Sequence, residues 1–231
     1  MRNAIRLAAV CGILAAAAAL AVRRAKDSDA LPADETAADV RRAAQRFLTF
    51  GLIPVWVVPG FLDYRIHRAA KIEQTSGTHE SITHLLMIST TGAGVAAGLF
   101  FEIDATALAL MAASAVAHEA VLVWDLSYAA NARPPSAAEQ HVHSFLEVIP
   151  FTAFAFSACL HPRAFRAALT GREIGLRLTP RYHPDAPLYI AAILTLVTLG
   201  LFVPYTEELI RCWRTDRTIL PHQRDERHDM P

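Results

Sequence analysis

Charged residues are scarce in this chain. Only 19% of its 231 residues are Asp, Glu, Lys or Arg, whereas 53% are hydrophobic. Soluble globular domains carry about 25% charged residues, so the deficit indicates a membrane protein. The 22 basic and 22 acidic residues cancel, and this balance gives no indication of a nucleic-acid partner.

The three cysteines are few and far apart. Cys11, Cys159 and Cys212 each lie in or at the edge of an apolar run, so we expect buried thiols rather than a disulfide framework or a CxxC metal motif. The sequence also lacks a Walker P-loop, a GxGxxG after a strand and a GxSxG elbow. Nucleotide binding and serine hydrolase chemistry therefore have no support.

Apolar runs separated by short polar segments predict the fold. The runs are residues 7–22, 47–62, 81–101, 105–130, 136–160 and 187–205. Most of them approach the roughly 20 residues that a membrane-spanning helix needs. We therefore predict an all-α polytopic membrane helical bundle with about six transmembrane helices and a central antiparallel core of four helices.

The same pattern divides the chain into four regions. Residues 1–26, with basic residues on both sides of the apolar run, are expected to form an N-terminal anchor or signal segment. Residues 27–46 are predicted to be a polar linker and surface helix, and 47–210 the membrane helical bundle. Residues 211–231 are expected to be a charged, frayed tail.

Local signals predict several helix ends. Asp104 is a good N-cap, and Ser136-Ala-Ala-Glu139 matches a capping box. Gly77 supplies the backbone freedom for a tight turn, with Ser76 or Thr78 as the expected cap of the next helix. The helix before that turn is expected to continue toward Glu73, and residues 161–187 to form a polar loop.

Acids and histidines interrupt the apolar region at helical spacing. Side chains three, four or seven residues apart lie on one face of an α-helix. Such groups are costly in a membrane or a core unless something compensates them. Four successive apolar segments each carry a histidine and a carboxylate at these spacings: Asp63 and His67, Glu80 and His84, His118 and Asp125, and His143 and Glu147.

The alternating direction of successive spans places these four pairs at one face of the membrane, with His118 about 10 Å deeper than Asp125. A converging set of imidazoles and carboxylates is typical of a dinuclear metal site. It suits iron, with zinc or manganese as alternatives, and it exceeds what one tetrahedral zinc needs. We therefore predict that two metal ions are held by Asp63, His67, Glu80, His84, His118, Asp125, His143 and Glu147.

The segments His79-Glu80-x-x-x-His84 and His141-x-His143 resemble, in logic rather than in motif, the histidine-rich boxes of the membrane oxygenases of the desaturase and hydroxylase group. The HxxHH boxes of that group are absent here, so no individual catalytic role is carried over. The resemblance, which covers residues 63–147, implies two irons at the cytosolic ends of membrane helices and oxidation of a lipid by O₂.

On this basis we expect a di-iron oxidoreductase that acts on a lipid or another apolar substrate, with an electron-donor protein as a partner. The Ala- and Arg-rich, Lys-poor composition is typical of a bacterial genome of high GC content. We therefore expect an integral protein of the bacterial inner membrane, and the resemblance implies that the cluster faces the cytoplasm. The basic residues of the loops do not orient it, since both sides carry eleven.

Two other functions stay open at this point. One is a zinc-dependent membrane lipid hydrolase, in which one zinc takes three of the histidines and a carboxylate activates water. The other is a non-enzymatic proton or metal transporter, or a haem-binding membrane protein. Metal identity and stoichiometry separate the first from a di-iron enzyme, and a polar path across the bilayer is what transport requires.

Overall fold

The computed structural model describes residues 37–171, 173–175, 177–181 and 187–228. Within these ranges the chain is helical and forms no strand, which confirms the all-α class. The apolar run 7–22, the predicted anchor or signal segment, lies outside the described residues. The chain divides into two compact units, Met1–Ala43 and Ala44–Pro231, and every helix below lies in the second except the first, which begins in the first unit.

The helices follow one another with short connections. In chain order they are α2 (Ala37–Arg46), the π-helical η1 (Phe47–Leu52), α3 (Ile53–Ala70), the 3₁₀ turn η2 (Ile72–Gln74), α4 (Gly77–Phe100), α5 (Ala105–Ala132), α6 (Ala137–Leu160), α7 (Pro162–Leu169), α8 (Pro187–Val197), the π-helical η3 (Thr198–Phe202) and α9 (Val203–His228).

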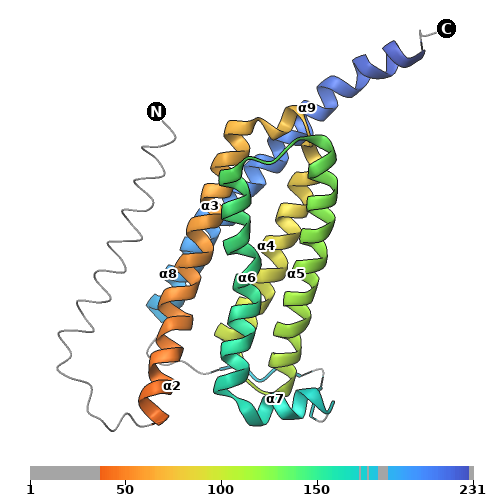
Figure 1. Ribbon diagram of the computed structural model, residues 1–231. Helices are drawn as coiled ribbons and strands as arrows, with labels where there is room; N and C mark the ends of the chain where they lie inside the picture. Colours follow the sequence, from red (N-terminus) through yellow and green to blue (C-terminus); the bar gives the residue numbers. More distant parts are fainter. Residues whose placement is uncertain (1–36, 172, 176, 182–186, 229–231) are drawn as a thin grey trace. The chain divides into compact units, whose positions relative to one another are not determined.

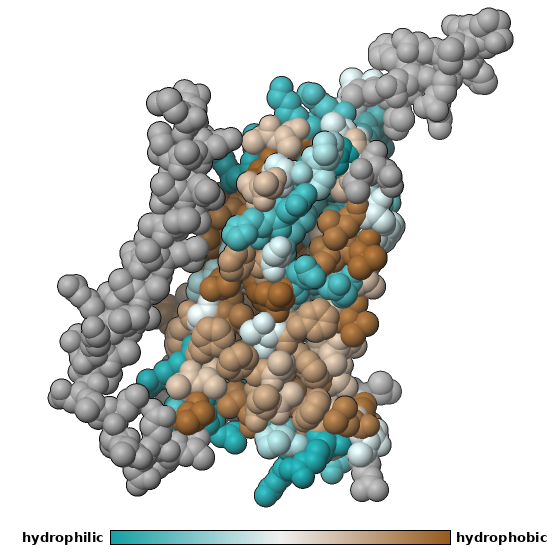
Figure 2. Space-filling view, in the orientation of Figure 1, coloured by the Kyte–Doolittle hydropathy of each residue, from teal (hydrophilic) through white to brown (hydrophobic). Residues whose placement is uncertain are grey.

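Five helices in the described part of the chain are long and apolar enough to cross a membrane: Ala38–Ala70, Gly77–Phe100, Ala105–Ala129, Ala137–Leu160 and Pro187–Thr218. They correspond to the last five predicted runs. Large apolar side chains cover their outer surface, with Val116 64% exposed and Leu199 62% exposed. Apolar side chains dominate the middle of the face in Figure 2, and hydrophilic ones gather toward its two ends. This distribution is the one expected of helices that face lipid.

The long helices pack side by side (Figure 1). Helix α4 packs along α5, α6 packs against α3 and α5, and α9 packs against α4 and α3. Glycines allow close approach between α3 and η3. A Cβ added to Gly60 would lie 2.5 Å from Leu201 Cδ2, and one added to Gly200 would lie 2.5 Å from Val57 Cγ1. Small residues at such contacts bring helix backbones together in membranes.

Two predicted helix caps are confirmed. Asp104 accepts a hydrogen bond from the Ala107 backbone N–H at 2.8 Å. Ser136 and Glu139 form the reciprocal capping box at the start of α6. Both caps are local, and each satisfies backbone donors that the first helical turn leaves unpaired.

The turn before α4 differs from its prediction in two ways. Helix α3 ends at Ala70 because Lys71 takes the left-handed conformation, with φ of 55°, so the helix stops before Glu73. Gly77 has the expected positive φ of 61°, but neither predicted side chain caps α4. Instead Asp216 of α9 accepts a hydrogen bond from the Thr78 backbone N–H at 3.0 Å.

Two other segments contain more helix than predicted. The polar loop 161–187 includes the helix α7. Helix α9 continues through the predicted tail, and both Glu208 and Cys212 on it are fully buried. The apolar run ends at Tyr205, but the helix does not, because α9 keeps an inward face that packs against α3 and α4.

Candidate metal centre

Acidic and histidine side chains from five helices meet inside the bundle at one end of the apolar helices. We call this group the acid–histidine cluster. Its carboxylates are each at most 2% exposed, as are two of its histidines, and the third, His143, is half-buried. The members are Asp63 and His67 of α3, Glu80 and His84 of α4, Asp125 of α5, Glu139 and His143 of α6, and Glu208 of α9.

His67 lies at the centre of the cluster. Its Nε2 is 3.4 Å from Asp63 Oδ1 and 3.3 Å from Glu139 Oε1, and its Nδ1 is 3.4 Å from Glu208 Oε2. Both ring nitrogens therefore face carboxylate oxygens, but neither makes a hydrogen bond with any residue that the structure describes. Buried polar atoms in proteins normally have a hydrogen-bond partner, so a buried imidazole with carboxylates on both sides and no hydrogen bond is unusual.

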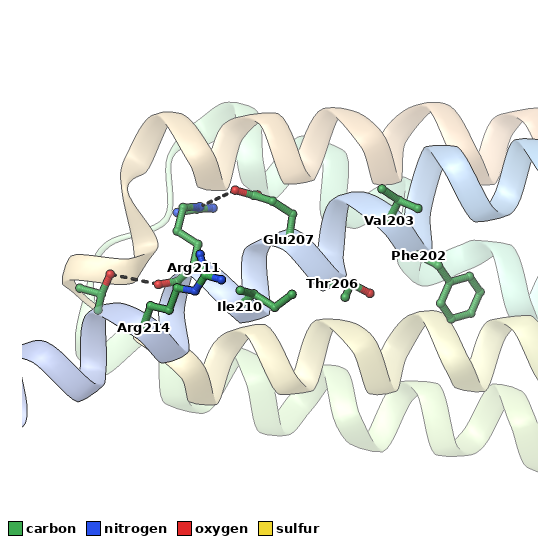
Figure 3. Close-up of a pocket in the computed structure, with 8 residues that line it drawn as sticks. Phe202, Val203, Thr206, Glu207, Ile210, Arg211 and Arg214 are labelled. Carbon is green, nitrogen blue, oxygen red and sulfur yellow. Dashed lines mark hydrogen bonds and ion pairs between the residues drawn. The ribbon is translucent and has the colours of Figure 1, made fainter.

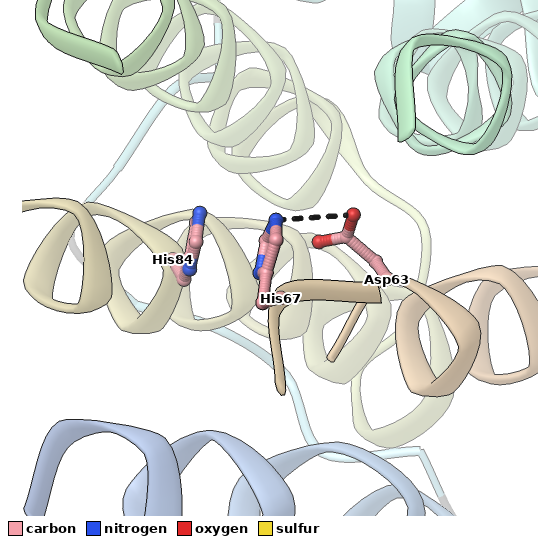
Figure 4. A group of neighbouring side chains, drawn as sticks. All are labelled: Asp63, His67 and His84. Atoms are coloured by element: carbon pink, nitrogen blue, oxygen red, sulfur yellow. Dashed lines mark ion pairs between the residues drawn. The ribbon is translucent and has the colours of Figure 1, made fainter. Parts of the chain in front are cut away.

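His84 stacks on His67, with ring centroids 4.4 Å apart and planes inclined by 8° (Figure 4). The Nδ1 atom of His84 lies 2.8 Å from Glu208 Oε1, which leaves Nε2 facing Glu80 and Asp125 at 3.9 Å each. Asp125 is itself held by the Thr83 hydroxyl, which donates to its Oδ1. A carboxylate on one ring nitrogen orients the other nitrogen toward a metal in many metal sites.

Two compact sets of ligand atoms arise from this packing. In Asp63, His67 and His84, one ligand atom from each residue lies within 4.8 Å of the others, and the same holds for His67, Glu139 and His143. His143 Nε2 also lies 3.0 Å from Asp63 Oδ1. Two atoms that each bind one ion at about 2.0–2.2 Å lie roughly 3.0–3.4 Å apart, so these separations fit shared coordination.

Hydrogen bonding leaves much of the cluster unsatisfied. Eight buried side-chain atoms of the cluster have no hydrogen-bond partner within the described part of the chain. Each such atom costs about 1–3 kcal/mol, and more when it is charged, so a compensating ligand is expected. These atoms are Asp63 Oδ1, both ring nitrogens of His67, Glu80 Oε2, His84 Nε2, Asp125 Oδ2, His143 Nε2 and Glu208 Oε2.

Arg133 neutralises part of the cluster. Its guanidinium donates to both oxygens of Glu139, with Nη1 2.9 Å from Oε2, and to Glu80 Oε1 at 2.7 Å. Burial lowers the pKa of Arg133, but these hydrogen bonds outweigh burial and raise the pKa above its ordinary value, so the guanidinium stays charged. Five buried carboxylates against one guanidinium leave four negative charges when the imidazoles are neutral.

Two divalent cations would carry four positive charges, which equals this excess. Protonated histidines are the other source of positive charge, but the stacked rings of His67 and His84 are 4.4 Å apart. Two imidazolium cations at that separation repel each other strongly in a buried site. Neutral imidazole is the form that binds metals, so bound cations and protonated rings are alternative sources of the balancing charge.

The predicted site residues fall into three groups in the structure. Asp63, His67, Glu80, His84, Asp125 and His143 are brought together in the cluster. His118 is buried but lies outside both compact sets, with its Nδ1 3.2 Å from the Met87 carbonyl oxygen. Glu147 is exposed. Whether any of these residues binds a metal stays a prediction.

Three residues of the site were missed by sequence reasoning or given another role. Glu208 lies beyond the last apolar run and Arg133 lies between two runs, so neither is singled out by the sequence pattern, and Glu139 is predicted only as a capping residue. The alternation argument applies to Glu208 as well, since the last span also ends at the cluster's face. Glu139 both caps α6 and contacts His67.

A recess lies on the surface of α9, outside the acid–histidine cluster. Its volume is about 660 Å³, and its lining includes Phe202, Ile210, Glu207 and Arg211 (Figure 3). No residue of the acid–histidine cluster lines it. Glu207 and Arg211 pair with each other at 3.4 Å, so this recess is chemically separate from the cluster.

Comparisons with protein-family models, with curated proteins and with solved structures find no match to this chain.

Proposed function

We propose that this chain is an integral membrane protein that binds two metal ions, most fittingly iron, in the acid–histidine cluster, and that it is an oxidoreductase acting on a lipid or another apolar substrate. One observation carries the proposal. Eight buried nitrogen and oxygen atoms from five helices converge there, and none has a hydrogen-bond partner among the described residues.

Several features support two ions rather than one. The two compact ligand sets share His67 and together use five residues, and further carboxylates stand beside them. The excess of four negative charges matches two divalent ions. Ferritin-like bundles hold two irons or manganese ions with carboxylates and histidines that project inward from neighbouring helices. The cluster offers the same classes of ligand, although the spacing within each helix is different.

The chain's residues have definite tasks in this proposal. His67, His84 and His143 present ring nitrogens to the ions, and Asp63, Glu139 and Glu208 present oxygens. Arg133 holds Glu80 and Glu139 in place, and the burial of the cluster keeps bulk water out. A pair of irons, when bound, supplies activation of O₂ for oxidation of the substrate.

The surroundings of the site are part of the proposal. The apolar helices support a position in a membrane, and the composition supports the bacterial inner membrane. The resemblance to the histidine-box oxygenases supports a cytoplasmic cluster and an electron-donor protein. An iron-loaded preparation given reductant, O₂ and membrane lipids should yield a lipid that has gained an oxygen atom or lost a pair of hydrogens, as read by mass spectrometry.

Elemental analysis of the detergent-purified chain tests the metal centre. The wild type should carry about two metals per chain, with iron the main element. His67→Ala should lose most of this metal, because His67 belongs to both ligand sets. His141→Ala is the matched control, since His141 lies on α6 with an exposed side chain, and it should keep wild-type metal content.

Two results would contradict the proposal. A wild-type protein that stays metal-free after exposure to iron and zinc has no metal centre. A single zinc per chain favours the zinc-dependent hydrolase instead.

A further inference from the structure

A small cavity adjoins the acid–histidine cluster on its apolar side. Its volume is about 30 Å³. Three residues of the cluster line it together with His118 and Tyr205, and apolar residues of α3, α4, α5, α6 and η3 complete the lining. The residues that matter here are the polar Asp63, His84 and His143, and the apolar Trp56, Leu122 and Leu201.

The cavity touches both compact ligand sets. Asp63 and His84 belong to the first set, and His143 belongs to the second. An ion held by either set therefore has protein ligands on one side and this cavity on another. A metal that takes part in catalysis needs such an open coordination position.

A buried nitrogen faces the same space. His118 lines the cavity and is 4% exposed. Its Nδ1 lies 3.0 Å from the Thr91 hydroxyl oxygen and 3.2 Å from the Met87 carbonyl oxygen, so the hydrogen bonds of this ring are made through Nδ1. Nε2 makes no hydrogen bond within the described part of the chain. An occupant of the cavity that forms a hydrogen bond with this nitrogen would satisfy it.

We propose that this cavity is the binding chamber for a small exogenous ligand of the metal centre, a molecule of two or three non-hydrogen atoms. The inference rests on the proposed metal centre. A water molecule needs about 10–15 Å³ measured in this way, so about 30 Å³ holds a ligand the size of dioxygen or azide. A hydrocarbon chain does not fit, so an apolar substrate has to approach the ions from outside this chamber.

Azide binding to the purified full-length chain loaded with Co²⁺ tests the chamber, because the visible spectrum of Co²⁺ reports a change of ligands whatever the native metal is. Azide should change the wild-type spectrum, and imidazole, a larger metal ligand, should not. Leu122→Phe should fill the chamber and weaken azide binding by at least about tenfold while Co²⁺ stays bound. Leu126→Phe is the control, since Leu126 is 42% exposed on the same helix, and it should bind azide like the wild type.

A second variant tests the chamber even if Leu122→Phe fails to fold. Leu122→Ala enlarges the chamber and should admit imidazole, which the wild type excludes. If the wild type binds no Co²⁺, the metal centre itself fails and the chamber with it. If Co²⁺ binds but azide leaves the spectrum unchanged, or if Leu122→Phe and Leu122→Ala both behave like the wild type, the chamber is wrong and the metal centre stands.

Discussion

At the scale of residues, Glu207 and Glu208 are adjacent carboxylates with different surroundings. The Glu208 side chain is fully buried and lies 2.8 Å from His84 Nδ1. The Glu207 side chain is 39% exposed, pairs with Arg68 at 2.9 Å and accepts a hydrogen bond from the Tyr64 hydroxyl. Successive side chains on a helix point about 100° apart, so one acid reaches the cluster while the other faces the helix surface.

This difference predicts the metal content of two matched variants. Glu208→Gln removes a carboxylate from the cluster and should lower metal affinity by at least about tenfold, as measured by competition with a chelator. Glu207→Gln makes the same chemical change one residue away and should leave the affinity unchanged. Equal losses in the two variants would contradict the role given to Glu208.

Arg133 predicts a stability effect at the same scale. Arg133→Leu leaves Glu80 and Glu139 without their cationic partner in a buried site, which should cost about 3–5 kcal/mol of unfolding free energy. Arg133→Lys keeps the charge but loses the forked contact with Glu139. Its unfolding free energy should lie between those of the wild type and Arg133→Leu. Thermal or denaturant unfolding in detergent measures both changes. Arg65→Leu, at an exposed position on α3, is the control, and a result for Arg133→Leu no larger than this control would argue against a buried network.

At the scale of elements, local signals were predictable and tertiary ones were not. The caps at Asp104 and Ser136 depend on residues within one helical turn, so the sequence pattern reveals them. The contact of Thr78 with Asp216 joins positions 138 residues apart, and no local rule predicts it. The length of α9 was also not predictable from local signals. After Tyr205 few of the residues on its inward face are apolar, so the sequence shows no apolar run there.

The turn at Gly77 gives a prediction at this scale. Gly77→Ala forces a side chain into a positive φ, and its Cβ would lie 2.8 Å from Asp216 Oδ1. Gly171→Ala imposes the same kind of strain, with φ of 67°, but nothing lies within 4 Å of the added Cβ. The strain alone costs about 1–2 kcal/mol, so Gly77→Ala should be the more destabilising of the two in thermal unfolding. Equal melting temperatures would show that the Asp216 contact does not matter.

At the scale of the whole molecule, alternating apolar spans were enough to predict that the acid–histidine pairs share one end of the helices. Helix rotation was harder to predict. His143 already lies at the edge of the cluster, with 13% of its side chain exposed. Four residues further along α6 the helix has turned by about 40° beyond a full turn, which is sufficient to carry Glu147 out of the cluster. Spacing alone therefore shows which residues share a helix face, but not which of them point into the cluster.

X-ray absorption at the metal edge of the purified protein tests the metal centre most directly. The account predicts a shell of nitrogen and oxygen neighbours at about 2.0–2.2 Å and a second metal at about 3.5–4 Å. Glu208→Gln should weaken the second-metal signal, and His141→Ala should preserve it. A spectrum with sulfur neighbours, with no second metal, or with no bound metal at all would contradict a dinuclear centre in the acid–histidine cluster.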